Sequence, residues 1–309
     1  KSSDAPIVSL AVLPFVNVKA EPETDYLAEG ITERVIYRLG RLTNLKVTSR
    51  NSSFRYKGCD IDARSVGREL NVQTVLMGRV SESDDQLSVS VELVDAHENS
   101  HLWGAQYIRP AADLSEIHET IAREITEKLQ LSRADRELQQ LAHRHSPGSK
   151  TYVLFLKGRY HFNKLNLDGV QKGIEYFLRA IEREPDYALA YAGLADCYNY
   201  LSNRDEAKKA VVMALKLDEQ LGEAHASLGF FRFVYDWDFT GAEAEFKRAL
   251  ALTPNYAEAH HWYAIYLANM GRHQEADQYA SRAIELDPLS LMMNITPALN
   301  YYLAREYDH

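Results

Sequence analysis

Apolar residues follow two kinds of pattern along the first part of the chain. Ile7–Val16 is almost continuously apolar, which predicts a buried strand, and a helix is predicted after it because apolar residues from Tyr26 to Leu39 recur three or four positions apart. Leu45–Ser49 adds a second short strand. Three later segments alternate apolar and polar residues, which predicts three antiparallel strands: Thr74–Ser81, Leu87–Asp95 and Ser100–Arg109.

Helices are predicted around these strands. Asp62–Leu70 is a short helix opened by an aspartate, and Asp113–Leu131 is a long amphipathic one. The helical pattern continues through Ser132–His143 and stops at Ser146–Gly148, where a proline and a glycine interrupt it. We therefore expect an α/β domain, with a mixed sheet and helices, over residues 5–145.

The second half of the chain repeats itself with a period of about 34 residues. Pro185–Tyr191 and Pro254–His260 are near copies of each other. Small residues recur at fixed positions because two antiparallel helices need a Gly or Ala where their axes approach, and large residues such as Phe177 fill the gaps beside them. The register is marked by Ala180, Ala214, Ala249 and Ala283.

These positions resemble the tetratricopeptide repeat, a family whose helix pairs stack into a superhelix with a concave ligand groove. The resemblance implies an all-α tetratricopeptide superhelix over residues 149–309. Two departures stand out, namely about three extra residues near Asn166–Gly169 and Glu219 in place of the usual proline. Four full repeats are expected, with a truncated fifth from Ser290: Lys150–Asp186, Tyr187–Leu221, Gly222–Asn255 and Tyr256–Leu289.

In this family one face of each first helix forms the ligand surface. Aromatic rings beside amides and mixed charges on that face suit an extended peptide or a partner helix. For Phe230 and Phe233, packing in the core is an equal alternative. The Lys and Asn clamp that chaperone-binding members use for a terminal carboxylate is absent. Carried over residue by residue, the groove comprises Phe155, Arg159, Phe162, Asn163, Asp196, Asn199, Tyr200, Glu223, Phe230, Phe233, Glu258, His261, Ile265 and Asn269.

A second resemblance is carried by Leu10–Phe15, Tyr26–Glu33 and Ser49–Gly58. These segments resemble the amino-terminal domain of TolB-like proteins, an α/β unit. Such a unit followed by tetratricopeptide repeats is similar to the regulatory tail of bacterial receptor-type serine/threonine kinases, winged-helix regulators and class III adenylate cyclases. The order of the two units implies a regulatory or sensory role in signalling.

Composition and motifs narrow the choice of function. The formal net charge of -9 argues against nucleic-acid binding, which depends on Lys and Arg neutralising phosphates. No apolar run approaches the roughly 20 residues that span a bilayer, so membrane insertion by this region is not expected. Phosphate-binding loops, dinucleotide fingerprints, kinase motifs and metal-ligand spacings are also missing. We expect no catalytic residue, cofactor or metal, and a kinase parent would carry its catalytic domain elsewhere.

One basic segment is a second candidate site. Arg50, Arg55 and Lys57 are interleaved with Phe54 and Tyr56 after a predicted strand. Such a patch could hold an anionic ligand or the acidic segment of a partner. The favoured alternative is a structural connection whose aromatic residues cover the core.

Our leading hypothesis is a non-enzymatic regulatory region that binds protein or peptide partners through the groove. Two alternatives stay open: a scaffold or dimerisation module that forms a homodimer, and an enzyme with a site between the two units near Arg50 and Arg55. The compartment depends on the parent protein. A receptor kinase would place this region on the extracytoplasmic side of the inner membrane, and the other parents would place it in the cytoplasm.

Overall fold

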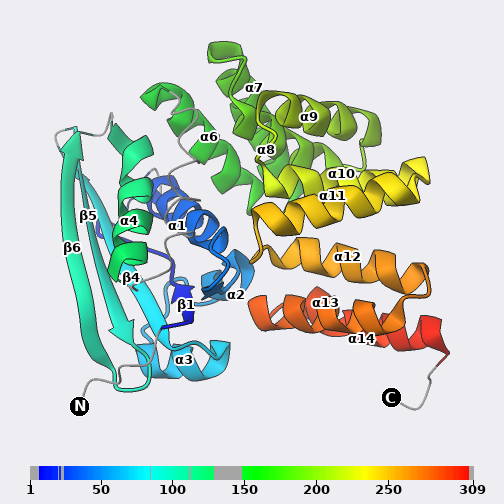
Figure 1. The fold of residues 1–309 in the computed structure, drawn as a ribbon. Coiled ribbons are helices and arrows are strands. Elements are labelled where there is room, and N and C mark those ends of the chain that lie inside the picture. The colour runs from blue at the N-terminus through cyan, green and yellow to red at the C-terminus, as the bar shows by residue number, and fades with distance from the viewer. Residues whose placement is uncertain are drawn as a thin grey trace.

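The computed structural model describes residues 7–19, 21, 24–83, 85–110, 113–128 and 148–305. Its first half contains a mixed sheet with the strand order β3-β1-β4-β5-β6, in which β1, β3 and β4 are parallel and β4, β5 and β6 are antiparallel (Figure 1). This confirms the predicted fold class. The strands are β1 (Ser9–Val12), β2 (Val16–Asn17), β3 (Lys46–Val47), β4 (Thr74–Ser83), β5 (Gln86–Asp95) and β6 (Ser100–Pro110).

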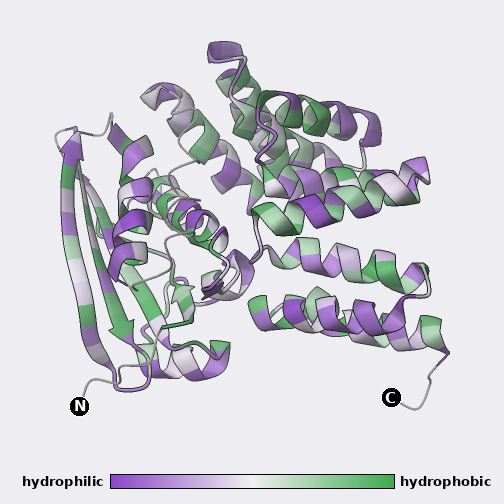
Figure 2. Cartoon of the chain, in the orientation of Figure 1, coloured by the Kyte–Doolittle hydropathy of each residue, from purple (hydrophilic) through white to green (hydrophobic). Residues whose placement is uncertain are grey.

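The sheet is covered by helices on both faces. Helices α1 (Asp25–Gly40) and α4 (Leu114–Lys128) pack on one face, and α3 (Ala63–Leu70) packs on the other. Strand β1 sends Leu10 to the first side and Ala11 to the second, which explains why its sequence is apolar throughout. Strands β5 and β6 instead mix hydrophobic and hydrophilic positions along their length (Figure 2).

The second half is a stack of antiparallel helix pairs, as the period predicts. Phe177 fills the gap beside Gly158, where an added Cβ would lie 2.6 Å from the Phe177 ring. Only a residue without a side chain allows this approach, so the small-residue register has the predicted cause. The pairs are α6 (Ser149–Phe162) with α7 (Leu167–Arg183), α8 (Ala188–Tyr200) with α9 (Arg204–Leu217), α10 (Gly222–Phe231) with α11 (Phe239–Leu252), and α12 (Ala257–Asn269) with α13 (His273–Leu286).

Two local features were not predicted. Arg50–Phe54 forms a short helix, α2, because the Ser49 side chain accepts a hydrogen bond from the Ser52 N–H and caps it. The first helix of the third repeat ends in a π-helical turn, Arg232–Asp236. Such a turn widens the helix locally.

The two halves are in extensive contact. Helix α1 packs against α6 so closely that a Cβ on Gly30 would lie 2.8 Å from Leu156. At the far end of the stack, the Ser49 N–H donates to the Leu286 carbonyl at 2.8 Å, and the Ser52 hydroxyl donates to Asp287 at 2.5 Å. Helices α1 and α2 therefore bridge the first and fourth repeats (Figure 1).

One buried cluster runs through both halves and joins the core of the sheet to the first three repeats. The predicted helical continuation at Ser132–His143 and most of the break at Ser146–Gly148 lie outside the described residues. The division into units at 5–145 and 149–309 remains our proposal. In this division, a single shared core holds the units together.

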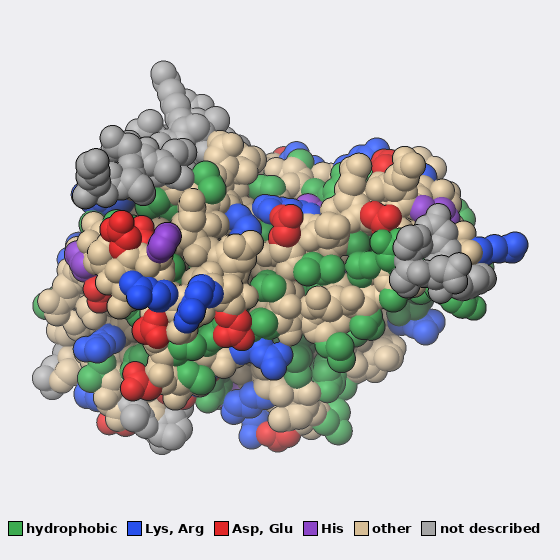
Figure 3. All heavy atoms as spheres, turned by 90° about the horizontal axis from the view of Figure 1, so that it is seen from below, with side chains coloured by type: hydrophobic (Ala, Val, Ile, Leu, Met, Phe, Trp, Pro, Cys, Tyr) green, Lys and Arg blue, Asp and Glu red, His purple; other side chains and the backbone are tan. Residues whose placement is uncertain are grey.

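Helix α14 (Leu291–Ala304) follows the fourth repeat. Figure 3 shows hydrophobic side chains spread over the helical half of the molecule, and on α14 the exposed ones are Leu291, Met292, Ile295, Leu299 and Tyr302. The described part of the stack thus ends on an exposed apolar face. No helix in the described ranges is both long and apolar enough to cross a bilayer.

Candidate functional site

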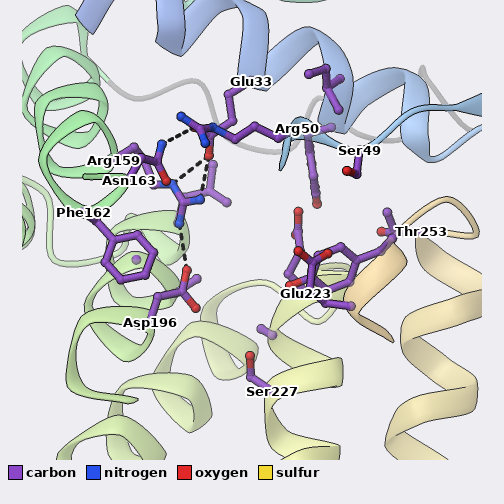
Figure 4. A pocket seen from close by; sticks show the side chains of 18 of the residues that line it. Glu33, Ser49, Arg50, Arg159, Phe162, Asn163, Asp196, Glu223, Ser227 and Thr253 are labelled. Atoms are coloured by element: carbon purple, nitrogen blue, oxygen red, sulfur yellow. Dashed lines mark hydrogen bonds and ion pairs between the residues drawn. The ribbon is translucent and has the colours of Figure 1, made fainter. Parts of the chain in front are cut away.

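A pocket of about 460 Å³ lies between the α/β unit and the first helices of the repeats. Helices α1 and α2 form its roof, and the inner faces of α6, α8, α10 and α12 form its floor (Figure 4). Its size is that of a small-molecule site or of a site for a few residues of peptide. The predicted residues that line it are Arg50, Phe155, Arg159, Phe162, Asn163, Asp196, Asn199, Tyr200, Glu223 and Glu258.

An ion-pair cluster ties the roof to the floor. The Arg159 guanidinium contacts Glu33 of α1 at 2.6 Å and Asp196 of α8 at 2.7 Å. The Asn163 amide donates to the other Glu33 oxygen at 2.9 Å, and Arg50 forms an ion pair with that oxygen at 3.3 Å (Figure 4). Glu33 of α1 therefore binds two residues of the first repeat, Arg159 and Asn163, and also Arg50 of α2.

The charge state of Glu33 follows from these contacts. Burial alone would raise its pKa, but the two guanidinium groups of Arg159 and Arg50 and the Asn163 amide together lower it to about 2. Glu33 is thus ionised at neutral pH, and its buried negative charge is balanced by the two guanidinium groups.

Two other carboxyl groups behave differently. Glu223 and Glu258 lie in the first turns of α10 and α12, where acidic residues favour the helix dipole. Burial raises the pKa of each to about 7, and neighbouring Asp287 adds to the effect on Glu258. The only side chain bonded to Glu258 in the described part of the chain is Asn51, at 3.2 Å. Near neutral pH, both groups are poised between the neutral and charged forms.

Glu258→Gln is expected to stabilise the protein at alkaline pH. Because the folded pKa of about 7 lies above the ordinary value of 4.5, the wild-type protein loses stability as pH rises through this range, and the variant does not. We expect equal stability at pH 4.5 and a gain of about 2 kcal/mol in the free energy of unfolding at pH 8. Urea unfolding of both proteins at both pH values measures this. If the variant and the wild type differed in free energy of unfolding by the same amount at pH 4.5 and pH 8, the prediction would be contradicted.

Other pocket residues escaped prediction from the sequence. Arg34 and Tyr37 of α1 line the roof, and Trp262 of α12 lines the floor. Arg34 and Tyr37 lie on a predicted amphipathic helix, and the pattern of that helix contains no sign of a ligand site. They face the repeats only because residues more than 100 positions apart in the sequence come into contact.

The remaining predicted groove residues do not line this pocket. Phe230 and Phe233 pack beside the cluster around Phe246, and the His261 ring is hydrogen-bonded to Thr296 at 2.7 Å. Ile265 is half-buried, and its carbonyl accepts a bond from the exposed Asn269 amide.

The basic patch is likewise divided. Arg50 lies in the pocket, whereas Arg55 donates to the Leu289 carbonyl at 3.1 Å. Lys57 forms an ion pair with Glu29 at 2.7 Å and one with Asp25 at 3.3 Å. All three side chains thus have partners within the protein.

Two family models match the chain. Residues 6–129 match the family described as HilA/YgeH-like transcriptional regulator, second domain, and residues 245–278 match the tetratricopeptide repeat. The second match confirms that the chain contains tetratricopeptide repeats. The first shows that the α/β unit is similar to a domain of proteins described as transcriptional regulators.

Individual proteins match parts of the chain. It is 33% identical over 187 residues to the protein named "Putative adenylate cyclase 3" of Rhizobium meliloti (strain 1021), covering 60% of this chain and 32% of that protein. It is 30% identical over 120 residues to the photosystem I assembly protein Ycf3 of Dioscorea elephantipes, covering 38% of this chain and 56% of that one. The chain thus spans about a third of the first relative and just over half of the second.

Among solved structures, a thermophilic tetratricopeptide repeat protein of Thermus thermophilus superposes with a TM-score of 0.41 and 20% identity. The match covers 62% of this chain and 97% of that one.

Proposed function

We propose that this chain is a non-enzymatic regulatory region of a bacterial signalling protein, and that it binds a short segment of a protein partner in the groove of its repeats. One observation carries the proposal. Nine residues that the resemblance to the tetratricopeptide family assigns to the groove line a single pocket: Phe155, Arg159, Phe162, Asn163, Asp196, Asn199, Tyr200, Glu223 and Glu258.

The end of the pocket built by the last turns of α6 and α8, here called the outer end, suits a peptide. Leu165, Asn199 and Tyr200 are exposed to solvent there, so a chain segment can enter from this side. The Tyr200 hydroxyl donates to the Leu165 carbonyl at 2.8 Å, which holds the ring in place before any partner binds. An ordered aromatic ring beside an amide side chain provides an apolar contact and a hydrogen-bonding group at little entropic cost.

The chemistry of the pocket favours binding over catalysis. The pocket-lining hydroxyl groups are those of Ser49, Ser227 and Thr253 and the tyrosines, and none of these Ser or Thr hydroxyls is hydrogen-bonded to a His or a carboxylate among the residues described. An activated nucleophile needs such a base. Similarity to proteins named as transcriptional regulators and as an adenylate cyclase supports a signalling role. A kinase parent remains a prediction, as do the compartment and a homodimer.

Tyr200→Ala is expected to weaken peptide binding by at least about 10-fold, since aromatic anchors contribute on the order of 2 kcal/mol at such sites. Peptides of about 12 residues would be selected from a displayed random library on the full chain, and their affinities measured by fluorescence anisotropy. Leu178→Ala, which truncates an exposed residue of α7 away from the pocket, is the matched control and should bind normally. Selected peptides that bind the Tyr200→Ala variant as tightly as the wild type would refute the groove assignment.

A further inference from the structure

The inner end of the pocket differs from the outer one. Its residues come from the first turns of α10 and α12 and from the second half of α1, whereas the outer end is built by the last turns of α6 and α8. The cluster of Arg159, Glu33 and Asp196 lies between the two ends. The inner end, here called the inner compartment, is therefore the part of this one pocket that lies on the far side of the ion-pair cluster from Tyr200.

Arg34 is the central feature of the inner compartment. Its side chain lines the pocket although the residue is only 9% exposed. Its Nε has no hydrogen-bond partner, and within the described ranges no carboxylate forms an ion pair with its guanidinium. The guanidinium instead lies 4.7 Å from the centre of the Tyr37 ring, and the buried Tyr37 hydroxyl has no hydrogen-bond partner among the residues that the structure describes. No carboxylate among the described residues contacts this buried guanidinium directly, so its free Nε can pair with an anionic group that arrives from outside.

A negative group lies on the opposite side of this compartment. Glu223 lines the pocket floor, and in the described structure no side chain donates a hydrogen bond to its carboxylate. It is close enough to Arg34 for the two charges to attract, yet they do not form an ion pair. The pocket thus presents a guanidinium and, across from it, a carboxyl group with a pKa of about 7, which ionises when an ammonium group of a ligand lies beside it.

The other charged groups of the pocket have partners within the protein, and Glu258 among them accepts a hydrogen bond from Asn51 at 3.2 Å. Arg159, Glu33 and Asp196 pair with one another, and Arg50 pairs with Glu29 and Glu33. A ligand that carried only a negative charge would therefore be repelled by the Glu223 carboxylate. A ligand that carried only a positive charge would be repelled by the Arg34 guanidinium. Only a ligand with both charges close together complements the compartment.

We propose that the inner compartment binds a small zwitterion with the chemistry of a free amino acid. Its carboxylate pairs with Arg34 and accepts a hydrogen bond from the Tyr37 hydroxyl, and its ammonium group pairs with Glu223. Leu189, Ala192 and Ala224 line the same pocket and provide apolar contacts for a side chain. Because Arg34 belongs to α1 and Glu223 to α10, the bound molecule bridges the α/β unit and the repeats. The site adds a metabolite signal to the proposed regulatory role.

The test uses the full chain and the twenty standard amino acids, each added separately. At least one is expected to raise the melting temperature by about 3 °C at ten times its dissociation constant. Arg34→Met and Glu223→Gln should each weaken its binding, measured by calorimetry, by about 10- to 100-fold. Arg179→Met and Glu175→Gln, which break an exposed ion pair on α7, are the matched controls and should bind as the wild type does.

Ligand analogues test the same contacts on the wild-type chain, so the proposal can still be tested if a variant fails to fold. The N-acetyl derivative and the carboxamide of the binding amino acid each lack one charge, and each should bind the wild-type chain at least about 10-fold more weakly. The proposal is overturned if none of the twenty binds, if either analogue binds as tightly as the parent, or if the folded Arg34→Met variant binds normally. Peptide affinity is measured with Tyr200 variants, so the two proposals can fail independently.

Discussion

Replacing Asn255 with alanine is expected to lower the free energy of unfolding by about 3 kcal/mol. The Asn255 side chain is buried between the two halves, where its amide lies within hydrogen-bond distance of the carbonyls of Gly40, Leu42 and Leu45 at 3.1, 2.8 and 2.9 Å. Its oxygen accepts a bond from the Val47 N–H at 3.3 Å. Alanine would leave several of these backbone groups buried without a partner, and each such group costs roughly 1 to 3 kcal/mol.

Asn255→Asp provides a sharper version of the same test. A carboxylate has the shape of the amide but has no hydrogen to donate and would face the carbonyl oxygens with a negative charge, so it should be at least as damaging as alanine at neutral pH. Urea unfolding of the full chain measures both variants. Asn269→Ala removes an exposed amide whose one hydrogen bond among the described residues is to Ile265 in its own helix, and it should cost less than about 0.5 kcal/mol. Equal effects at positions 255 and 269 would show that Asn255 does not join the two halves.

Glu33→Gln is expected to destabilise the protein by about 3 kcal/mol at pH 7, because it leaves Arg159 and Arg50 without their shared buried counterion. The effect should depend on pH in a defined direction. The folded pKa of about 2 lies below the ordinary value of 4.5, so the contribution of Glu33 is complete above pH 4.5 and is lost as pH falls toward 2.

The measurement is the difference in unfolding free energy between wild type and Glu33→Gln at pH 7, 4.5 and 3. This difference should be largest at pH 7 and should shrink as the pH falls below 4.5. Glu175→Gln, at an exposed pair, should show little effect at any pH. A Glu33→Gln effect that stays constant from pH 7 to pH 3 would mean that this carboxylate is not held by the two arginines.

The sequence predicts the architecture well, because local patterns determine it. The small residues at Gly158 and Ala180 mark where helices touch, and the alternation from Leu87 to Leu93 identifies the buried face of β5. The same register places Arg159 and Asp196 on inner helix faces, where they do meet. Periodicity alone cannot say which inner residues remain accessible. Phe155, for example, is only 4% exposed, and its ring contacts Phe177 and Tyr187.

The roof of the pocket was beyond prediction, since it depends on contacts between distant residues. Asn255 occupies the position of Asp186 in the near-copied segments, and only the structure shows that its amide binds carbonyls more than 200 residues away. Nothing in the sequence pattern distinguishes Arg34 from the other polar residues of its helix. The sequence did contain one signal for the short helix α2. Ser49 is a residue type that caps helices, and it directly precedes Arg50.

The central claim is that a partner segment enters the groove beneath α1 and contacts both halves of the protein. Hydrogen exchange of the full chain, measured with and without a selected peptide, tests it most directly. We predict that the peptide slows exchange in α1, α6 and α8 and leaves α7 and α9 unchanged. Slower exchange confined to α7 and α9, with none in α1, would contradict the account.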